Sequence, residues 1–521
     1  MKMIKNNKWL LLVALTMIAC SDDDAVVVNE TADGLPLTAG SADFSKYVSL
    51  GNSLTAGYSD NALFMEGQAN SFPAILASQF ALVGGGEFKI PFMNDNVGGL
   101  LLGGNLIAGP RLYFNGSGPV PVSEIPSTEV SNVLSGPFNN MGVPGAKSYH
   151  LVAPGYGNVA GVALGQSNPY YVRFASSPSA TVLGDAVAQN PTFFSLWIGN
   201  NDVLGYATSG GAGTNQLGNL NPATYGGNDI TDPTVFASVY STILDGLTAG
   251  GAKGVVANIP DVTSVPYFTT VPTNPIPGLP SANATSLNQL FGGINAALAG
   301  AGLPARYVTL MADDGNSATV EANPLLIVDE SLINISAQIT AALTPIYGGP
   351  TAAFLGNLFG QTRHASNAMG SRDYIVLTAS GIIGTTTTAA PAPFNTVGVS
   401  YPMQDSAVLT ADETAQVKTA TDAFNATIQS LASAKGLAFV DANSLLNQVS
   451  NGGITANNFT VTSNFVTGGG FSLDGVHPSP RGYALIANKF FEAINATYGS
   501  NFKGVNIGDY RILYPQDSAN F

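Results

Sequence analysis

Alternation of strand-like and helix-like segments is the feature that most constrains this fold. Residues 192–198 (TFFSLWI) form a continuous apolar run, which is typical of a strand buried on both faces. Residues 47–50 and 254–259 form similar runs, and residues 437–440 form a shorter one. Segments with apolar residues at helical spacing accompany these runs. Strands that alternate with helices predict an α/β fold, in which helices cover both faces of a parallel sheet.

Capping residues mark where several of the predicted helices begin. Asp232 precedes Pro233, and a cap followed by proline is typical of a first helical turn. Thr410 and Glu413 have the spacing of a capping box. We therefore predict helices from residue 71 to 82, from 233 to the glycines at 250, from 411 to Gly436, and from Ser479–Pro480 onward.

Long stretches rich in Gly, Pro and Asn separate these units, notably residues 83–140, 207–230 and 268–408. Such long connections usually carry function or small elements of their own, and residues 306–311 and 373–378 look like short strands. We predict one α/β domain over 43–500, with inserts at about 83–140 and 268–408 that cap one edge, and a C-terminal extension over 501–521. A separate domain within 268–408 is the alternative.

The N-terminus resembles a bacterial lipoprotein signal. Three lysines precede an apolar run over residues 9–18, which is too short to span a bilayer comfortably. Cys20 follows at once and is the only cysteine, so a disulfide within the chain is impossible. We predict a signal peptide over 1–19, lipidation at Cys20 and a flexible tether over 20–42. A buried structural cysteine is the alternative.

The residues after Cys20 suggest a location. Ser21 and three aspartates resemble the acidic surface-export signal of lipoproteins in the Bacteroidetes group, although a solvated acidic linker would look the same. The expected location is therefore the outer membrane, with the protein exposed at the cell surface through its lipid anchor.

The charge balance excludes some partners. The net charge is −15, and only 10% of the 521 residues are charged. Nucleic-acid binding needs a basic face, and docking on anionic lipid through side chains needs a polybasic patch. We therefore expect no nucleic-acid partner.

Polar blocks follow predicted strands or precede the last predicted helix at four places. They are Gly51-Asn52-Ser53-Leu54, Gly142-Val143-Pro144-Gly145, Gly199-Asn200-Asn201-Asp202 and Asp474-Gly475-Val476-His477. Ligands of an open parallel sheet bind at the carboxyl ends of its strands, so these blocks can converge. Their residue types fit acyl transfer, with Ser53 as nucleophile, His477 as base and Asp474 as its orienting carboxylate. Glycine N–H groups and the Asn201 amide can stabilise an oxyanion.

In this order, the four blocks resemble those of the SGNH hydrolases, also called GDSL esterases and lipases. The resemblance implies a flavodoxin-like three-layer α/β/α sandwich and a reaction that needs no metal or cofactor. It implies that Ser53 attacks, that His477 acts as base and then acid, and that Asp474 orients it. It also implies an oxyanion hole formed by the Ser53 N–H, the Gly145 N–H and the Asn201 amide. Gly142 is the alternative to Gly145.

The chain departs from this family pattern at two points. Asn52 stands where the family usually has Asp, which removes a charge but keeps side-chain hydrogen bonding, so we expect activity to survive. The long inserts exceed a minimal member of the family, and we expect them to roof the active site. Residues 98–104 (GGLLLGG) could line an acyl pocket or pack as a loop on the core. His150 and His364 lack a comparable context and are expected to be structural.

The sequence thus predicts a surface lipoprotein that hydrolyses carboxylic esters. Lipid or other acyl esters are the first choice of substrate, because the inserts are apolar and weakly charged. Removal of acetyl groups from surface glycans needs the same catalytic residues and is the alternative chemistry. A binding lipoprotein on an inactive hydrolase fold is the alternative from another class.

Overall fold

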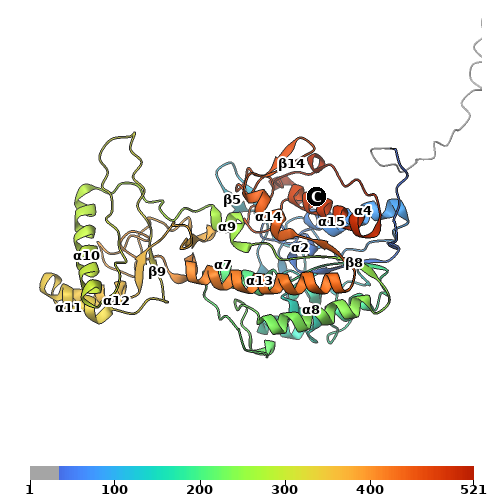
Figure 1. Ribbon diagram of the computed structural model, residues 1–521, viewed down its shortest axis with the longest axis horizontal. Coiled ribbons are helices and arrows are strands. Elements are labelled where there is room, and N and C mark those ends of the chain that lie inside the picture. The colour runs from blue at the N-terminus through green and yellow to red at the C-terminus, as the bar shows by residue number, and fades with distance from the viewer. Residues whose placement is uncertain (1–33, 521) are drawn as a thin grey trace, which may run out of the picture.

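A five-stranded parallel sheet forms the centre of the fold (Figure 1). The computed structural model describes residues 34–520, so Cys20 and the predicted signal peptide lie outside the described residues. The sheet has the spatial order β13-β8-β7-β1-β6. Counted along the chain, this is the order 2-1-3-4-5 of flavodoxin-like sheets. The strands are β1 (Tyr47–Gly51), β6 (Asn140–Gly142), β7 (Phe193–Trp197), β8 (Lys253–Ala257) and β13 (Ala438–Val440).

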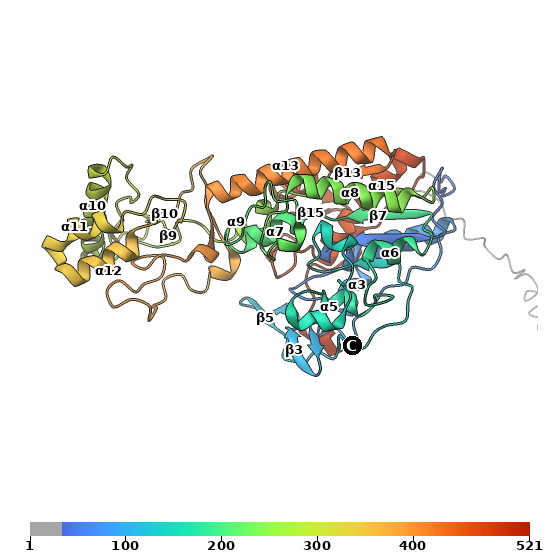
Figure 2. The same ribbon diagram turned by 90° about the horizontal axis from the view of Figure 1, so that it is seen from below.

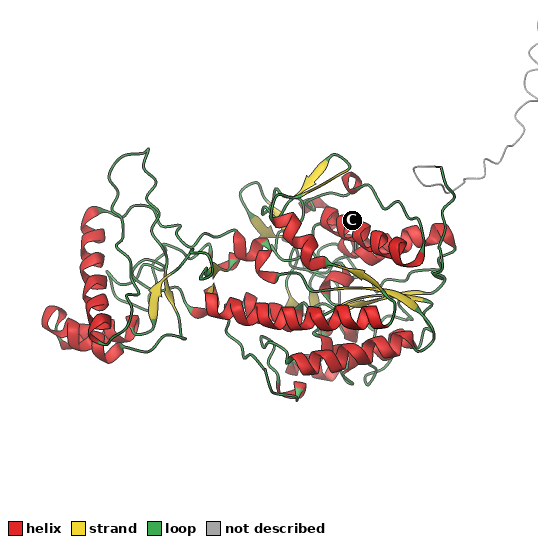
Figure 3. Ribbon diagram, in the orientation of Figure 1, coloured by secondary structure: helices red, strands yellow, loops and turns green. Residues whose placement is uncertain are grey.

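Helices cover both faces of this sheet. Successive side chains of a strand point to opposite sides, and here both sets are buried, so each face packs against helices. Val48 and Leu50 belong to a core formed with α6 (Val182–Val187), α7 (Asn201–Thr208), α8 (Pro233–Thr248) and α13 (Ala411–Ala434). Tyr47 and Trp197 belong to a second core formed with α4 (Phe72–Phe80), α14 (Ala442–Ser450) and α15 (Pro480–Tyr498). Figure 3 shows the strands between these two groups of helices. The predicted α/β class with a covered parallel sheet is therefore confirmed.

The predicted capping residues begin their helices as expected. The side chain of Asp232 accepts hydrogen bonds from the backbone of Thr234 and Val235 at the start of α8. Thr410 and Glu413 form the capping box of α13. The side chains of Ser71 and Ser479 cap α4 and α15 in the same way.

Edge strand β6 was not predicted as a strand, because its sequence is polar and ends in glycine. Asn140 Nδ2 donates to the carbonyl of Thr55 at 3.0 Å, and Asn140 Oδ1 accepts from the Gly142 N–H at 2.9 Å. A Cβ on Gly142 would lie 2.3 Å from the backbone nitrogen of Ala56. Glycine is therefore required here by the close approach of α2 (Ser53–Ala56).

The first insert forms two small hairpins. They pair β2 (Leu100–Leu102) with β3 (Asn105–Ala108) and β4 (Leu112–Phe114) with β5 (Pro119–Pro121), and they lie at one side of the domain (Figure 2). Leu100 is buried in a small cluster with Ala56 and Val130. The glycine-rich run at 98–104 is therefore a hairpin packed on a core of its own.

The second insert forms a lobe that extends away from the sheet instead of capping its edge (Figure 1). Its outer part contains α10 (Ser281–Gly300), α11 (Ser336–Tyr347), α12 (Gly349–Phe359) and the antiparallel pair of β9 (Leu326–Val328) and β10 (Thr362–His364). These elements share a separate hydrophobic core that includes Phe291, Ile339 and Phe359.

The prediction of a strand over residues 306–311 was wrong. This segment lies beside α10, and side chains accept hydrogen bonds from its backbone N–H groups. Asn295 Oδ1 accepts from residues 306 and 307, Asn288 Oδ1 from 310, and Asn323 Oδ1 from 311. These asparagines replace the partner strand that the sequence pattern suggested.

Several short elements complete the fold. Of the predicted strand over 373–378, only β11 (Tyr374–Ile375) forms, and it pairs with β12 (Val408–Leu409). The others are α3 (Met65–Ala69), α5 (Pro169–Val172), α9 (Pro266–Thr269) and the hairpin of β14 (Ile454–Ala456) and β15 (Phe459–Val461).

The two ends of the described chain pack together. Thr38 N donates to Asn501 Oδ1 at 2.7 Å, and Asn501 Nδ2 donates to the carbonyl of Pro36 at 3.0 Å. The prediction of a flexible tether is thus wrong for residues 36–42, which belong to the folded domain. The predicted C-terminal extension is also part of the fold, because Arg111 donates to the carbonyl of Pro515 at 2.8 Å. No helix within residues 34–520 has the length and apolar character needed to cross a membrane.

Candidate active site

Ser53 lies at the carboxyl end of β1, where α2 begins. β1 is the strand at which the chain order of the sheet reverses, and ligands of such sheets bind at this point. Asn52 is the N-cap of α2, and its Oδ1 accepts a hydrogen bond from the Leu54 N–H at 3.0 Å. This cap holds the first turn in place. Ser53 is therefore presented at the edge of the sheet by two ordered elements.

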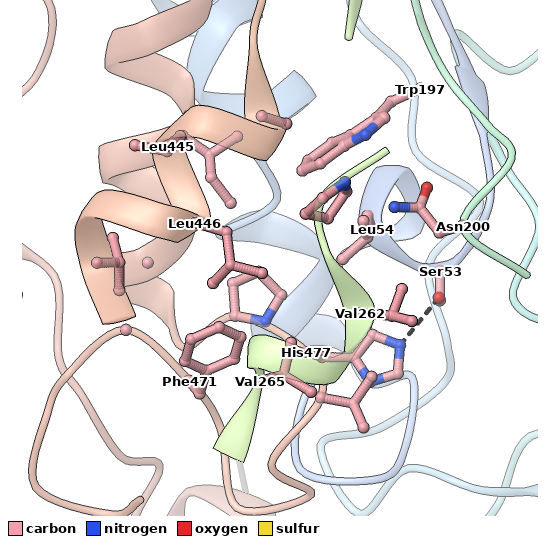
Figure 4. Close-up of a pocket in the computed structure, with 18 of the residues that line it drawn as sticks. Ser53, Leu54, Trp197, Asn200, Val262, Val265, Leu445, Leu446, Phe471 and His477 are labelled. Atoms are coloured by element: carbon pink, nitrogen blue, oxygen red, sulfur yellow. Dashed lines mark hydrogen bonds between the residues drawn. The ribbon is translucent and has the colours of Figure 1, made fainter. Parts of the chain in front are cut away.

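The structure brings Ser53, His477 and Asp474 together. His477 Nε2 lies 2.9 Å from Ser53 Oγ, as the dashed line in Figure 4 marks. His477 Nδ1 lies 2.9 Å from Asp474 Oδ2. The tautomer with the proton on Nδ1 makes Nε2 an acceptor for the Ser53 hydroxyl, which is the arrangement that general-base activation of a serine requires.

The Asp474 carboxylate is fully engaged by hydrogen bonds. Its Oδ1 accepts from the backbone N–H groups of Val476 and His477, each at 2.8 Å. Its Oδ2 accepts from the Asn61 N–H at 3.0 Å, in addition to His477 Nδ1. Burial alone would raise the pKa of Asp474, but His477 and the backbone donors outweigh it and hold this pKa at about 2. Asp474 is therefore ionised at neutral pH and can stabilise a protonated His477.

Backbone donors near Ser53 distinguish the two candidate glycines. Within residues 34–520, the N–H groups of Ser53 and Gly145 have no hydrogen-bond acceptor. The Gly142 N–H is buried and donates to Asn140, so it has no capacity for an oxyanion. This contrast favours Gly145, which is exposed, over Gly142. Gly145 nevertheless lies outside the lining of the pocket described below.

Asn201 and its neighbour Asn200 both line that pocket. Asn201 Nδ2 donates to the carbonyl of Ala146 at 2.9 Å, which orients the amide and leaves its second N–H for a ligand. Asn200 was not predicted as a site residue. Its Oδ1 accepts from Asn52 Nδ2 at 3.1 Å, and Figure 4 shows it beside Ser53. Asn52 was the sequence signal that could have indicated Asn200, because the side-chain amide of Asn52 needs an acceptor for its N–H group.

A buried carboxyl group anchors the helix that carries Asn201. Asp202 is fully buried and accepts hydrogen bonds from Ser148 N at 2.8 Å and Ser148 Oγ at 2.7 Å. Burial raises the pKa of Asp202, and the bonds from Ser148 oppose that shift. These bonds fix the start of α7 against the segment that follows Gly145. The two predicted oxyanion donors, the Gly145 N–H and the Asn201 amide, are therefore held in a fixed relative position.

An apolar pocket of about 100 Å³ opens beside Ser53 and His477 (Figure 4). Asn52, Asn200 and Asn201 line it together with Ser53 and His477, and most of the other lining side chains are aliphatic or aromatic. Most of these come from α14, α15 and the loop after β8, including Val262, Val265, Leu445, Leu446, Val449, Leu485 and Ile486, and Phe471 comes from the segment before α15. No residue of 83–140 or 268–408 lines this pocket, so the expected roof of insert residues does not form its walls. Leu377 of the second insert nevertheless lies close to Gly475, beside Asp474.

The other two histidines are structural, as expected. Nδ1 of His150 accepts from the Lys147 N–H, and Nδ1 of His364 accepts from the Val308 N–H, each at 3.0 Å. Burial lowers the pKa of both imidazoles to about 4, with a further contribution from Lys147 at His150. Both are therefore neutral near pH 7.

A carboxyl cluster in which only Glu413 is buried has the ligand types of a cation site. Glu330, Asp405 and Glu413 place one carboxylate oxygen each within 4.8 Å of the others, near the start of α13. Burial raises the pKa of Asp405 to about 7 and that of Glu413 to about 8, and Glu330 adds to both shifts. Glu413 already serves the capping box of α13. None of the three lines the pocket at Ser53.

Comparisons with protein-family models, with curated proteins and with solved structures found no match to this chain.

Proposed function

We propose that the protein is a serine-dependent carboxylic ester hydrolase of the SGNH type. The observation that carries this proposal is the hydrogen-bonded chain from Ser53 through His477 to the ionised Asp474, in which Ser53 and His477 line an apolar pocket. The four sequence blocks and the flavodoxin-like strand order also support it.

The first half-reaction acylates Ser53. Ser53 Oγ attacks the ester carbonyl carbon while His477 Nε2 takes the hydroxyl proton, and Asp474 stabilises the imidazolium that forms. The negative charge moves to the carbonyl oxygen, where the N–H groups of Ser53, Gly145 and Asn201 donate to it. The intermediate then collapses, the bond to the alcohol oxygen breaks, and His477 returns the proton to the leaving alcohol.

The second half-reaction releases the acid. His477 Nε2 takes a proton from a water molecule that attacks the acyl-serine carbonyl. The second tetrahedral intermediate uses the same oxyanion donors. Its collapse breaks the bond to Ser53 Oγ, which regains its proton from His477, and a carboxylic acid leaves. The chemistry uses side chains and backbone N–H groups of this chain, together with water.

The pocket favours esters with an aliphatic acyl chain. Each methylene group transferred from water into such a pocket contributes about 0.8 kcal/mol, or about fourfold in binding. A glycan acetyl ester has a single methyl group to place there and would leave most of the apolar lining unused. Glycan O-deacetylation therefore remains an alternative for the same residues without a structural observation that favours it.

Hydrolysis of p-nitrophenyl esters tests the proposal. Wild-type protein is expected to turn over an octanoyl ester, and Ser53→Ala is expected to abolish turnover while its thermal unfolding matches wild type. A folded Ser53→Ala variant with wild-type turnover would refute the assignment. If the wild-type protein binds the octanoyl ester but does not hydrolyse it, the alternative of a binding lipoprotein is favoured.

A further inference from the structure

A tight turn lies directly after the helix that carries Ser53. The N–H of Ser59 donates to the carbonyl of Ala62 at 3.1 Å, and the N–H of Ala62 donates back to Ser59 at 3.0 Å. The two central residues, Asp60 and Asn61, have φ values of 50° and 64°. Positive φ at both positions defines a type I′ turn, which Asn and Asp tolerate better than other non-glycine residues. Residues 59–62 are called the bridging turn below.

The bridging turn is bonded to the segment that carries the acid and the base. Ser59 Oγ donates to the carbonyl of Pro478 at 2.6 Å, and the Asp60 N–H donates to Ser472 Oγ at 3.0 Å. Asp60 Oδ1 accepts from the Leu473 N–H at 2.8 Å.

A fourth bond reaches the predicted triad directly. The Asn61 N–H donates to Asp474 Oδ2, the same oxygen that contacts His477 Nδ1. The bridging turn therefore holds both the backbone before Asp474 and the carboxylate itself.

Asp60 is an unfavourable residue to bury. It is 1% exposed, its Oδ2 is buried without a hydrogen-bond partner, and within residues 34–520 it forms no salt bridge, since Arg111 acts on it only from a greater distance. Burial raises the pKa of Asp60 to about 7, with the Leu473 N–H opposing that shift. A buried carboxyl group of this kind costs stability. Its single side-chain hydrogen bond joins it to the residue before Asp474.

We propose that Asp60 is a positioning residue for the hydrolysis, which keeps Asp474 and His477 in line with Ser53 through the bridging turn. The inference rests on the proposed function. Ser53 and His477 come from distant parts of the chain, and a displacement of about 1 Å in such a site can lower the rate about 100-fold. The bridging turn begins six residues after Ser53 and bonds to the carboxylate of Asp474, so it links the nucleophile to the other two triad residues.

Variants at Asp60 test the role of its carboxyl oxygen. Asp60→Ala removes the acceptor for the Leu473 N–H and should lower kcat about 10- to 100-fold, with KM changed less than about threefold. Asp60→Asn keeps a carbonyl oxygen at that place and should retain kcat within about fivefold. Asp185→Ala is a matched control, because Asp185 accepts hydrogen bonds from Tyr171 and Ser176 but does not line the pocket.

Variants at Asn61 test the turn without opening a cavity, since this side chain is exposed. Glycine favours positive φ and keeps the N–H, so Asn61→Gly should retain kcat within about twofold. Valine is β-branched and disfavours positive φ, so Asn61→Val should lower kcat about 3- to 10-fold. This pair decides the question even if Asp60→Ala fails to fold.

A second readout does not depend on ester turnover. The His477 proton shared with Asp474 should give a downfield proton resonance in wild type, Asn61→Gly and Asp60→Asn. His477→Gln assigns the signal by its loss. We expect Asp60→Ala and Asn61→Val to weaken or remove this resonance.

The inference is overturned if the folded Asp60→Ala and Asn61→Val variants match their controls in kcat. It is equally overturned if kcat falls while the resonance is unchanged, because the effect then lies outside the Asp474–His477 pair. If wild type shows no Ser53-dependent turnover, the proposed function fails, and the resonance alone still decides whether the bridging turn positions the pair.

Discussion

Narrowing the apolar pocket should change chain-length preference and leave the chemistry intact. Val449 lies on α14, is 6% exposed and lines the pocket. Val449→Phe adds a ring that occupies the space of about three methylene groups, so a chain that fills the pocket loses about 2.4 kcal/mol of transfer free energy at about 0.8 kcal/mol each. This corresponds to about a 60-fold loss in kcat/KM for an octanoyl ester. An acetyl ester places only one methyl group in the pocket, so we expect it to keep its kcat/KM within about twofold.

Gln448→Phe is the matched control for this experiment. It adds the same ring on the same helix, at an exposed position that does not line the pocket. The assay is a p-nitrophenyl panel from acetyl to palmitoyl, with thermal unfolding of each variant, because overpacking can cost about 1–3 kcal/mol. The pocket is not the acyl-chain site if Val449→Phe lowers kcat/KM equally for all chain lengths, or if Gln448→Phe produces the same selective loss.

Three further perturbations test other parts of the account. Asn201→Ala should lower kcat about 10²- to 10³-fold, as loss of one oxyanion donor does, while Asn200→Ala should cost less than about tenfold; the reverse order in esterase kinetics would assign the donor to Asn200. Asp60 lies near Asp474 and Arg111, and its pKa is raised to about 7. Its contribution to stability is therefore present below about pH 4 and is lost as the pH rises through about 7. Asp60→Asn should raise the Tm relative to wild type more at pH 8 than at pH 5. An equal Tm difference at both pH values would show that the Asp60 charge is not the cause. Cys20→Ala should move the protein from the membrane fraction to the soluble fraction, and its retention with the membrane would argue against a lipid anchor.

Local patterns in the sequence predicted much of the central domain. Buried strands such as β7 appear as apolar runs, and the caps at Asp232 and Thr410 are visible because a cap satisfies backbone groups within one turn. The four sequence blocks of the site could also be found from short stretches of sequence. Asp474 and His477 are three residues apart, and Ser53 follows a strand, so the sheet alone was enough to suggest that they meet.

Long-range contacts account for what the sequence did not reveal. Strand β6 depends on the close approach of α2 to Gly142, and the segment 306–311 depends on asparagines from other parts of the chain. Residues 98–104 were one possible lining of an acyl pocket, but α14, α15 and the loop after β8 supply most of the lining instead. The bridging turn was missed because no pattern around Asp60 indicates its bonds to residues 472–478.

Covalent trapping of the nucleophile tests whether Ser53 is activated by His477. An alkyl fluorophosphonate reacts with a serine only where a base and oxyanion donors activate it, and intact-mass and peptide mass spectrometry locate the adduct. We predict one adduct per chain, on the peptide that contains Ser53, with none in Ser53→Ala and much slower formation in His477→Ala. An unlabelled wild-type protein, or an adduct at another residue that persists in Ser53→Ala, would contradict the account.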